Sequence, residues 1–158
     1  MPMNPTSKRN HSGFTLVELM VTIVIVSILI AVAVPTYKSQ IRKSRRTDAK
    51  TALLDLAARE ERYYSTGGTS SYTGVAANLG YSGAWPIQVG SGYYQISNPT
   101  GTITPATATA PASFTLTAVP VPGSDQAKDL ACAQFLLTST GVQTATGSDP
   151  NANTDCWQ

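Results

Sequence analysis

Reactive and charged residues are scarce in this chain, and their scarcity limits what it can do. Its 158 residues hold one histidine, His11, and two cysteines, Cys132 and Cys156. The spacing of the cysteines fits no zinc motif, and no histidine follows position 11. No nucleophile lies beside an evident base either. We therefore expect a protein that is not an enzyme and that uses no metal or other cofactor.

Charge is almost missing from one long stretch. From Phe14 to Val34 the only ionisable residue is Glu18. As a helix this stretch would be ~32 Å long at ~1.5 Å per residue, close to the ~30 Å hydrocarbon core of a bilayer. A carboxylate there costs roughly 2.5–3.5 kcal/mol on insertion, so Glu18 is a candidate functional residue, with snorkelling to the headgroups as the simpler alternative. A secretory signal peptide does not fit, because its apolar region is usually only ~7–15 residues long.

Positive charge gathers directly after this stretch. Residues 38–50, which we call the neck, contain one acid, Asp48, and six basic residues: Lys38, Arg42, Lys43, Arg45, Arg46 and Lys50. The region from Tyr63 onward has Lys128 alone against four aspartates. The positive-inside rule would place the neck in the cytoplasm. The N-terminal junction and the cysteines argue the opposite, and we expect the N-terminus to be cytoplasmic.

The two cysteines are expected to form a disulfide. A single span with its N-terminus in the cytoplasm places the rest of the chain outside, where disulfides persist. Cys132 and Cys156 would close a loop of about 25 residues, which stabilises a fold by on the order of 3 kcal/mol. The region after the helix is small, so such a covalent link is useful.

One helix is predicted from about residue 14 to residue 64. Pro35 lies inside it and is expected to kink it or melt it locally. Beyond Pro35 an apolar stripe recurs at helical spacing and contains Ala49, Leu53, Leu56, Ala57 and Tyr64. Residues 65–92 resemble a long loop, with a short helical turn near Val75–Leu79.

Beyond residue 92 the pattern alternates with a period of two. The predicted strands are Tyr93–Ser97, Phe114–Ala118, Ala133–Thr138 and, less regularly, Val142–Thr146. Residues 98–112 are low in complexity and indicate a solvated connection. We expect an α+β fold in which an antiparallel sheet of three to four strands packs on the apolar stripe of the helix.

The N-terminal junction resembles the processing site of type IV prepilins. Lys8 and Arg9 form a short basic leader that ends at Gly13, and the sequence Phe14-Thr15-Leu16-Val17-Glu18 follows. Further on, Asp129-Leu130-Ala131-Cys132 and the terminal Cys156-Trp157 resemble the PilE-type minor pilins. The resemblance is most specific over residues 8–64 and looser beyond them.

The resemblance implies a set of roles. Gly13 would precede the prepilin peptidase cut, and Phe14 would become a methylated N-terminus. Glu18 would meet the Phe14 amine of a neighbouring subunit in the filament. The protein would be a minor pilin of a type IV pilus, supporting pilus assembly and hence twitching motility or adhesion. A major pilin and a pseudopilin of a type II secretion system remain alternatives.

The same resemblance implies partners and a location. The partners would be other pilin subunits, the prepilin peptidase and the assembly platform of the bacterial inner membrane. The subunit would reside in that membrane with a periplasmic head, and later in the pilus at the cell surface.

The resemblance also implies a division of the chain. Its expected parts are a leader (1–13), a transmembrane and assembly half-helix (14–34), an amphipathic half-helix (35–64), a loop (65–92) and a sheet region with the disulfide (93–158).

Two weaker patterns, in residues 149–155 and in the neck, could indicate a calcium site and a DNA contact. Asp149, Asn151, Asn153 and Asp155 alternate like the start of a calcium loop, but the central glycine and the terminal glutamate are missing, so a solvated loop is preferred. The basic neck could contact DNA. We expect it instead to face neighbouring subunits or anionic headgroups, and we expect no nucleic-acid partner because the head is acidic.

Overall fold

The computed structural model describes residues 13–67 and 70–158. Most of the predicted leader, with Lys8 and Arg9, lies outside the described residues. The chain divides into two compact units, Met1–Ser39 and Gln40–Gln158. A single helix, α1 (Leu16–Thr66), supplies residues to both.

Helix α1 agrees with the predicted helix to within two residues at each end. It continues through Pro35 without a break, so local melting is not seen, while the kink stays a prediction. The hydroxyls of its apolar part donate to the backbone of the preceding turn: Thr22 to the Glu18 carbonyl, Ser27 to the Ile23 carbonyl at 2.7 Å and Thr36 to the Val32 carbonyl at 3.0 Å. These bonds satisfy polar groups that lipid could not.

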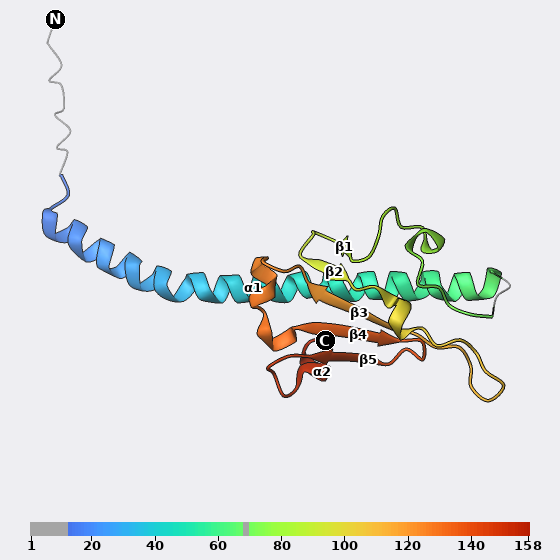
Figure 1. Ribbon diagram of the computed structural model, residues 1–158. Helices are drawn as coiled ribbons and strands as arrows, with labels where there is room; N and C mark the ends of the chain where they lie inside the picture. Colours follow the sequence, from blue (N-terminus) through green and yellow to red (C-terminus); the bar gives the residue numbers. More distant parts are fainter. Residues whose placement is uncertain (1–12, 68–69) are drawn as a thin grey trace, which may run out of the picture. The chain divides into compact units, whose positions relative to one another are not determined.

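The second unit contains one antiparallel sheet of five strands (Figure 1). Its spatial order is that of the chain: β1 (Ile87–Val89), β2 (Tyr94–Ile96), β3 (Thr115–Pro120), β4 (Gln134–Thr138) and β5 (Gln143–Thr146). The four predicted strands correspond to β2 through β5. The expectation of only three to four strands was wrong by one, because β1 lies in the stretch predicted to be loop.

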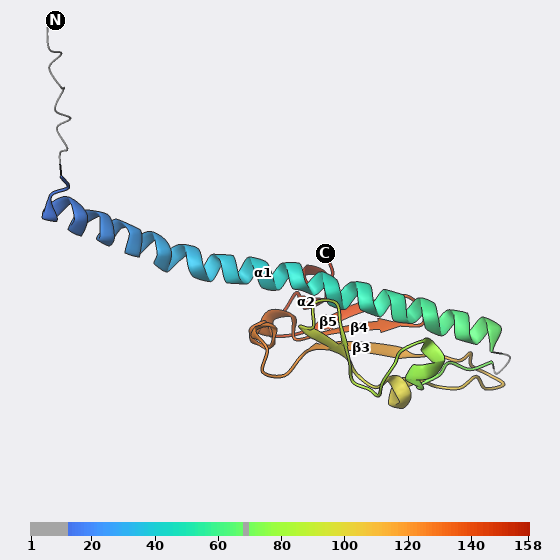
Figure 2. The same cartoon turned by 90° about the horizontal axis from the view of Figure 1, so that it is seen from above.

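The core forms where α1 covers one face of this sheet (Figure 2). Ala49, Leu53 and Leu56 are fully buried, as the apolar stripe predicts. Each strand contributes alternate side chains, and the ring of Phe135 on β4 lies 5.8 Å from that of Tyr94 and meets it edge-on. Large apolar side chains buried against the helix stabilise the head by ~1.5–3 kcal/mol each.

Short helices fill the connections. The turn expected near Val75–Leu79 is the 3₁₀ helix η1 (Ala76–Leu79). The β2–β3 connection contains η2 (Pro99–Thr102), and the β3–β4 connection contains η3 (Asp125–Lys128) and η4 (Leu130–Cys132). A last helix, α2 (Ala152–Asp155), packs beside β5.

Candidate assembly segment and head surface

The start of α1 carries the residues that the sequence singles out for assembly. Gly13 and Phe14 precede the helix, and the side chain of Phe14 is 81% exposed. The Thr15 hydroxyl accepts a hydrogen bond from the Glu18 backbone amide at 3.2 Å. Thr15 therefore caps the helix, and Glu18, three residues later, occupies the acidic position of a capping box. This S/T-x-x-E pattern is visible in the sequence, although the cap is not among the features predicted above.

The carboxylate of Glu18 is exposed and forms no ion pair within residues 13–67 and 70–158. At the first turn of a helix a negative charge is favoured by the helix dipole by ~0.3–1 kcal/mol. This is less than the roughly 2.5–3.5 kcal/mol that a carboxylate costs inside a bilayer. Capping alone thus leaves most of the cost of Glu18 unexplained, and a cationic partner is favoured.

The apolar half of α1 is exposed along its length. One 18-residue window has a mean hydropathy of 2.8, none of it is buried, and the helix is long and apolar enough to cross a membrane. The exposed side chains include Leu16, Met20, Val24, Ile28 and Val32. Exposed apolar patches of this extent mark contacts with a membrane or with other proteins.

The arginines of the neck do not face outward as expected, whereas Lys38 and Lys43 are exposed. Arg46 donates from Nε and Nη2 to the two Asp129 oxygens, both at 2.8 Å, and the side chains are only 11% and 7% exposed. Arg42 donates in the same way to Asp125 at 3.3 and 3.2 Å. The expectation that these arginines face neighbouring subunits or headgroups was wrong. They hold the β3–β4 connection onto α1 within one chain.

Neighbouring groups reinforce this arginine clamp. The Arg45 guanidinium lies 3.5 Å from the centre of the Tyr93 ring, with one nitrogen 3.9 Å from Asp125. The hydrogen bond from Arg42 lowers the pKa of the Asp125 carboxyl, and the hydrogen bond to Asp129 raises the pKa of Arg46. The two aspartates thus lie against the neck arginines and offset part of the neck charge.

A buried amide completes the clamp. Gln126 is fully buried, and its Nε2 lies 2.9 Å from the Tyr94 hydroxyl and 3.1 Å from an Asp129 oxygen. It also donates to the Arg42 backbone carbonyl at 3.2 Å. Burial raises the pKa of Tyr94 to about 12, so its hydroxyl stays protonated. The neck, the connection and β2 are thus linked by one polar network.

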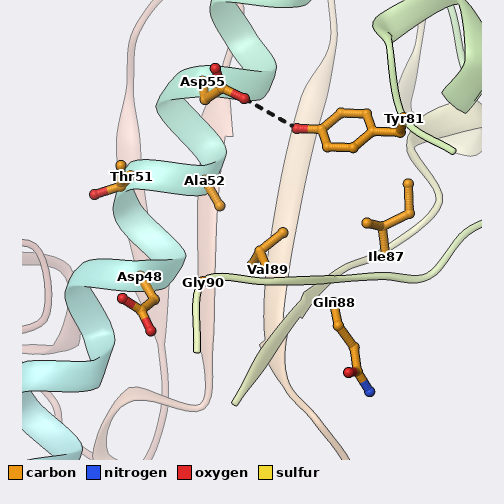
Figure 3. A pocket seen from close by; sticks show the side chains of 9 residues that line it. All are labelled: Asp48, Thr51, Ala52, Asp55, Tyr81, Ile87, Gln88, Val89 and Gly90. Carbon is orange, nitrogen blue, oxygen red and sulfur yellow. Dashed lines mark hydrogen bonds between the residues drawn. The ribbon is translucent and has the colours of Figure 1, made fainter. Parts of the chain in front are cut away.

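A surface hollow lies between α1 and β1 (Figure 3). It measures about 450 Å³, and its lining residues are Asp48, Thr51, Ala52, Asp55, Tyr81, Ile87, Gln88, Val89 and Gly90. Asp55 accepts the Tyr81 hydroxyl at 3.3 Å, and Asp48 accepts the Ser91 backbone amide at 3.0 Å. Gly90 has φ +56°, and a Cβ there would lie 2.6 Å from that of Asp48. The two carboxylates hold loops in place and disfavour phosphate-bearing ligands in this groove.

The cysteines and the calcium candidates lie at the C-terminal end of the sheet. Cys132 and Cys156 are bonded and fully buried. The Asn153 side-chain oxygen accepts the Ala145 backbone amide of β5 at 2.9 Å. Asp149 and Asp155 line a different, polar hollow together with neck residues such as Lys43 and Lys50. Within the described residues no three acidic, histidine or cysteine side chains form a metal-binding group.

Sequence comparisons decide the family. A family model described as the type IV minor pilin ComP, DNA uptake sequence receptor, matches residues 35–136, well over half of the chain. The chain belongs to this family. A second family model, the prokaryotic N-terminal methylation motif, matches residues 8–34. The resemblance to type IV pilins is therefore confirmed, and the pilin has the expected α+β fold with its C-terminal disulfide.

Individual pilins are more distant. The chain is 32% identical over 82 residues to the type IV major pilin protein PilA of Myxococcus xanthus. It is 33% identical over 72 residues to the fimbrial protein EcpC of Eikenella corrodens. These matches cover 52% and 46% of this pilin but only 36% and 47% of the two relatives. The chain thus matches less than half of the length of these curated relatives.

Proposed function

We propose that this pilin is a structural subunit, a minor pilin, of a type IV pilus. The observation that carries the proposal is the exposed apolar half of α1, whose single charge, Glu18, has no partner in the described part of the chain. The exposed segment belongs to one compact unit and the sheet of the head to the other. Contacts between different surfaces of successive subunits, called head-to-tail contacts, build open filaments when they do not close into a ring.

Processing would create the missing partner. Cleavage after Gly13 by a prepilin peptidase gives Phe14 a free α-amine, whose ordinary pKa is near 7.7–8.0. In hydrocarbon the amine of one subunit and the Glu18 carboxylate of the next relieve each other's desolvation. The apolar surfaces supply attraction, and the ion pair sets the axial register. Methylation of Phe14 leaves the cation in place.

The rest of the assembly route is part of the same proposal. The subunit would wait in the bacterial inner membrane with its head in the periplasm and enter the pilus through the assembly platform. Pro35 would let the membrane half of α1 adjust its direction relative to the head, because proline removes one backbone hydrogen bond.

Substitution of Glu18 tests the proposal. In Glu18→Ala the charged pair is lost, and such a contact is worth ~1.5–3 kcal/mol. Since ~1.4 kcal/mol is a factor of ten, we expect at least about tenfold less of this subunit in sheared pili. Thr15→Ala is the matched control, because it removes the helix cap but keeps the carboxylate. Leader cleavage should proceed in both variants. Equal incorporation of Glu18→Ala and the parent, or an equal loss in Thr15→Ala, would remove the pairing role.

The two structural alternatives differ in abundance and in place. A major pilin would dominate the protein of sheared pili, whereas a minor pilin is a small fraction of it. A pseudopilin would support secretion, and its deletion would leave surface pili and twitching intact.

DNA binding is the second candidate function, because the matching family is described as a DNA uptake sequence receptor. This description goes against our expectation of no nucleic-acid partner, which is untested. The charge argument behind that expectation is also weaker, since Asp125 and Asp129 are paired with neck arginines. The same pairing leaves few cations for phosphates, so we expect a shallow salt dependence. Duplex binding by the full chain in detergent, measured against salt, checks this; no binding at low salt removes the candidate.

A further inference from the structure

A buried carboxyl group interrupts the apolar stripe of α1. Glu60 lies at the stripe spacing after Ala49, Leu53 and Leu56, and like them it is fully buried. Its Oε2 accepts the Thr73 backbone amide at 3.0 Å. Its Oε1 is buried too and has no hydrogen-bond partner in the described part of the chain. A buried carboxylate with an unsatisfied oxygen is costly, whereas the neutral acid is much less so.

Among residues 13–67 and 70–158 no cation pairs with Glu60. On α1, Arg59 is engaged with Asp55 at 2.7 Å, Arg62 is exposed, and the neighbouring Glu61 is itself an acid. On the facing segment the ionisable group is Tyr72, whose pKa is raised to about 12 and which therefore stays neutral. An ionised Glu60 would thus meet only like charge and low polarity.

The partner of Glu60 belongs to the segment 70–75, which follows α1 and leads to η1. The Thr73 hydroxyl accepts the Val75 backbone amide at 3.1 Å and the Asn78 side-chain amide at 3.2 Å. Trp85 Nε1 donates to the Gly74 carbonyl at 2.8 Å. These bonds hold the segment to η1 and its loop. Two hydrogen bonds join the segment to α1: the buried one from the Thr73 amide to Glu60, and an exposed one from the Tyr72 hydroxyl to Glu61 at 2.8 Å.

We propose that Glu60 is a proton-operated latch: the neutral acid holds segment 70–75 against α1, and its ionisation releases the segment. The release follows from geometry, because a charged Glu60 lowers its free energy by letting water reach Oε1. Segment 70–75 lies directly against this carboxyl group through the Thr73 amide, so its movement away from the helix would admit water. This device is independent of the filament role and would act in the isolated subunit.

The direction of the pH response follows from the same burial. Desolvation raises the pKa of Glu60 from its ordinary 4.5 to about 7, and Glu61 adds to the rise, while the Thr73 amide opposes it. The latched state therefore binds the proton more tightly than the released state. The latch is strongest below pH 4.5, weakens as the pH rises toward 7, and changes little above that.

Hydrogen exchange of the full chain in detergent micelles tests the latch. We compare the protection factors of amides 72–75 at pH 5 and pH 8, after correction for the intrinsic exchange rate at each pH. A pKa near 7 in the latched state predicts roughly 50-fold less protection at pH 8. Glu60→Gln keeps the shape and cannot ionise, so its protection should not change with pH. Glu61→Gln is the matched control on the next residue: its amide oxygen can still accept the Tyr72 hydroxyl, so it should keep most of the response.

Each outcome is decisive. Unchanged protection of the parent chain between pH 5 and pH 8 overturns the latch, even if a variant fails to fold. A pH response that persists in Glu60→Gln overturns it too, whatever Glu61→Gln shows. Loss of the response in Glu60→Gln alone supports it.

Discussion

Replacing Arg46 with alanine is expected to destabilise the head by about 3–5 kcal/mol, because it leaves the Asp129 carboxylate buried without its counter-charge. The pair is bidentate, with both bonds at 2.8 Å, and the Asp129 side chain is only 7% exposed. Asp129 also lies 3.1 Å from the Nε2 of buried Gln126, so its displacement would disturb that group too. Denaturant unfolding followed by the fluorescence of the head tryptophans, Trp85 and Trp157, measures the loss.

The chain offers a matched comparison for this pair. Arg42 makes a bidentate contact to Asp125 from one turn earlier on α1, but at 3.2–3.3 Å and with 39% of the Asp125 side chain exposed. Solvent screening weakens such a partly exposed pair. Arg42→Ala should therefore cost far less than Arg46→Ala. Equal losses in the two variants would show that burial does not set the energy of the clamp.

Much of the fold was predictable because it depends on local periodicity. The helical stripe of Ala49, Leu53 and Leu56 and the alternation in β2 through β5 each repeat often enough to be read from one segment. The strand β1, Ile87–Val89, was missed because it lies in a stretch rich in glycine and serine, whereas the equally short β2 is part of the longer alternating run Tyr93–Ser97. So short a run carries too little pattern, and pairing with β2 stabilises it instead.

The site was predictable only where its signal is local. The junction at Gly13 and Phe14 is a contiguous motif, so its family could be recognised from the sequence. The arginine clamp joins residues 83 positions apart in both of its bidentate pairs, and no local pattern matches a particular arginine to a particular aspartate. The site at Glu60 was only partly predictable. Its place on the apolar stripe was visible, but its burial required knowing that segment 70–75 covers it.

The boundary between the two compact units lies between Ser39 and Gln40. The expected division of the helix was at Pro35, where the backbone is perturbed, whereas the compact units meet after Ser39. The first neck arginine of the clamp, Arg42, follows directly. Helix packing in the head thus starts with residues that contact the sheet region and not at the proline, whose effect on direction remains a prediction.

Removing the disulfide is the second change with a large expected effect. In the double variant Cys132→Ala/Cys156→Ala, the unfolded chain regains the freedom of a loop closed across 24 positions, so the head should lose about 3 kcal/mol. Both cysteines are fully buried, and alanine avoids placing a new polar group there. Denaturant unfolding of the double variant and of the parent measures the loss, with the reduced parent as a third sample.

The parts of the head that lose hydrogen-exchange protection show whether the disulfide stabilises only the C-terminal segment or the whole sheet. Besides the disulfide, hydrogen bonds hold segment 147–158 to the rest of the head: from the Ser148 amide to the Leu130 carbonyl at 2.7 Å, from Trp157 Nε1 to the Thr144 carbonyl at 2.7 Å, from the Ala145 amide to Asn153, and from Lys50 Nζ to the Gln158 carbonyl at 2.8 Å. Gly147 lies so close to Ala131 that a Cβ would be 2.0 Å from its carbonyl oxygen, so any shift of η4 moves this segment too. Hydrogen exchange in the double variant should therefore rise first in α2 and beside β5, while β2 and β3 keep their protection. A uniform rise across all five strands would instead mean that the bond stabilises the whole sheet, and an unchanged midpoint would show that packing of Trp157 alone holds the C-terminal segment.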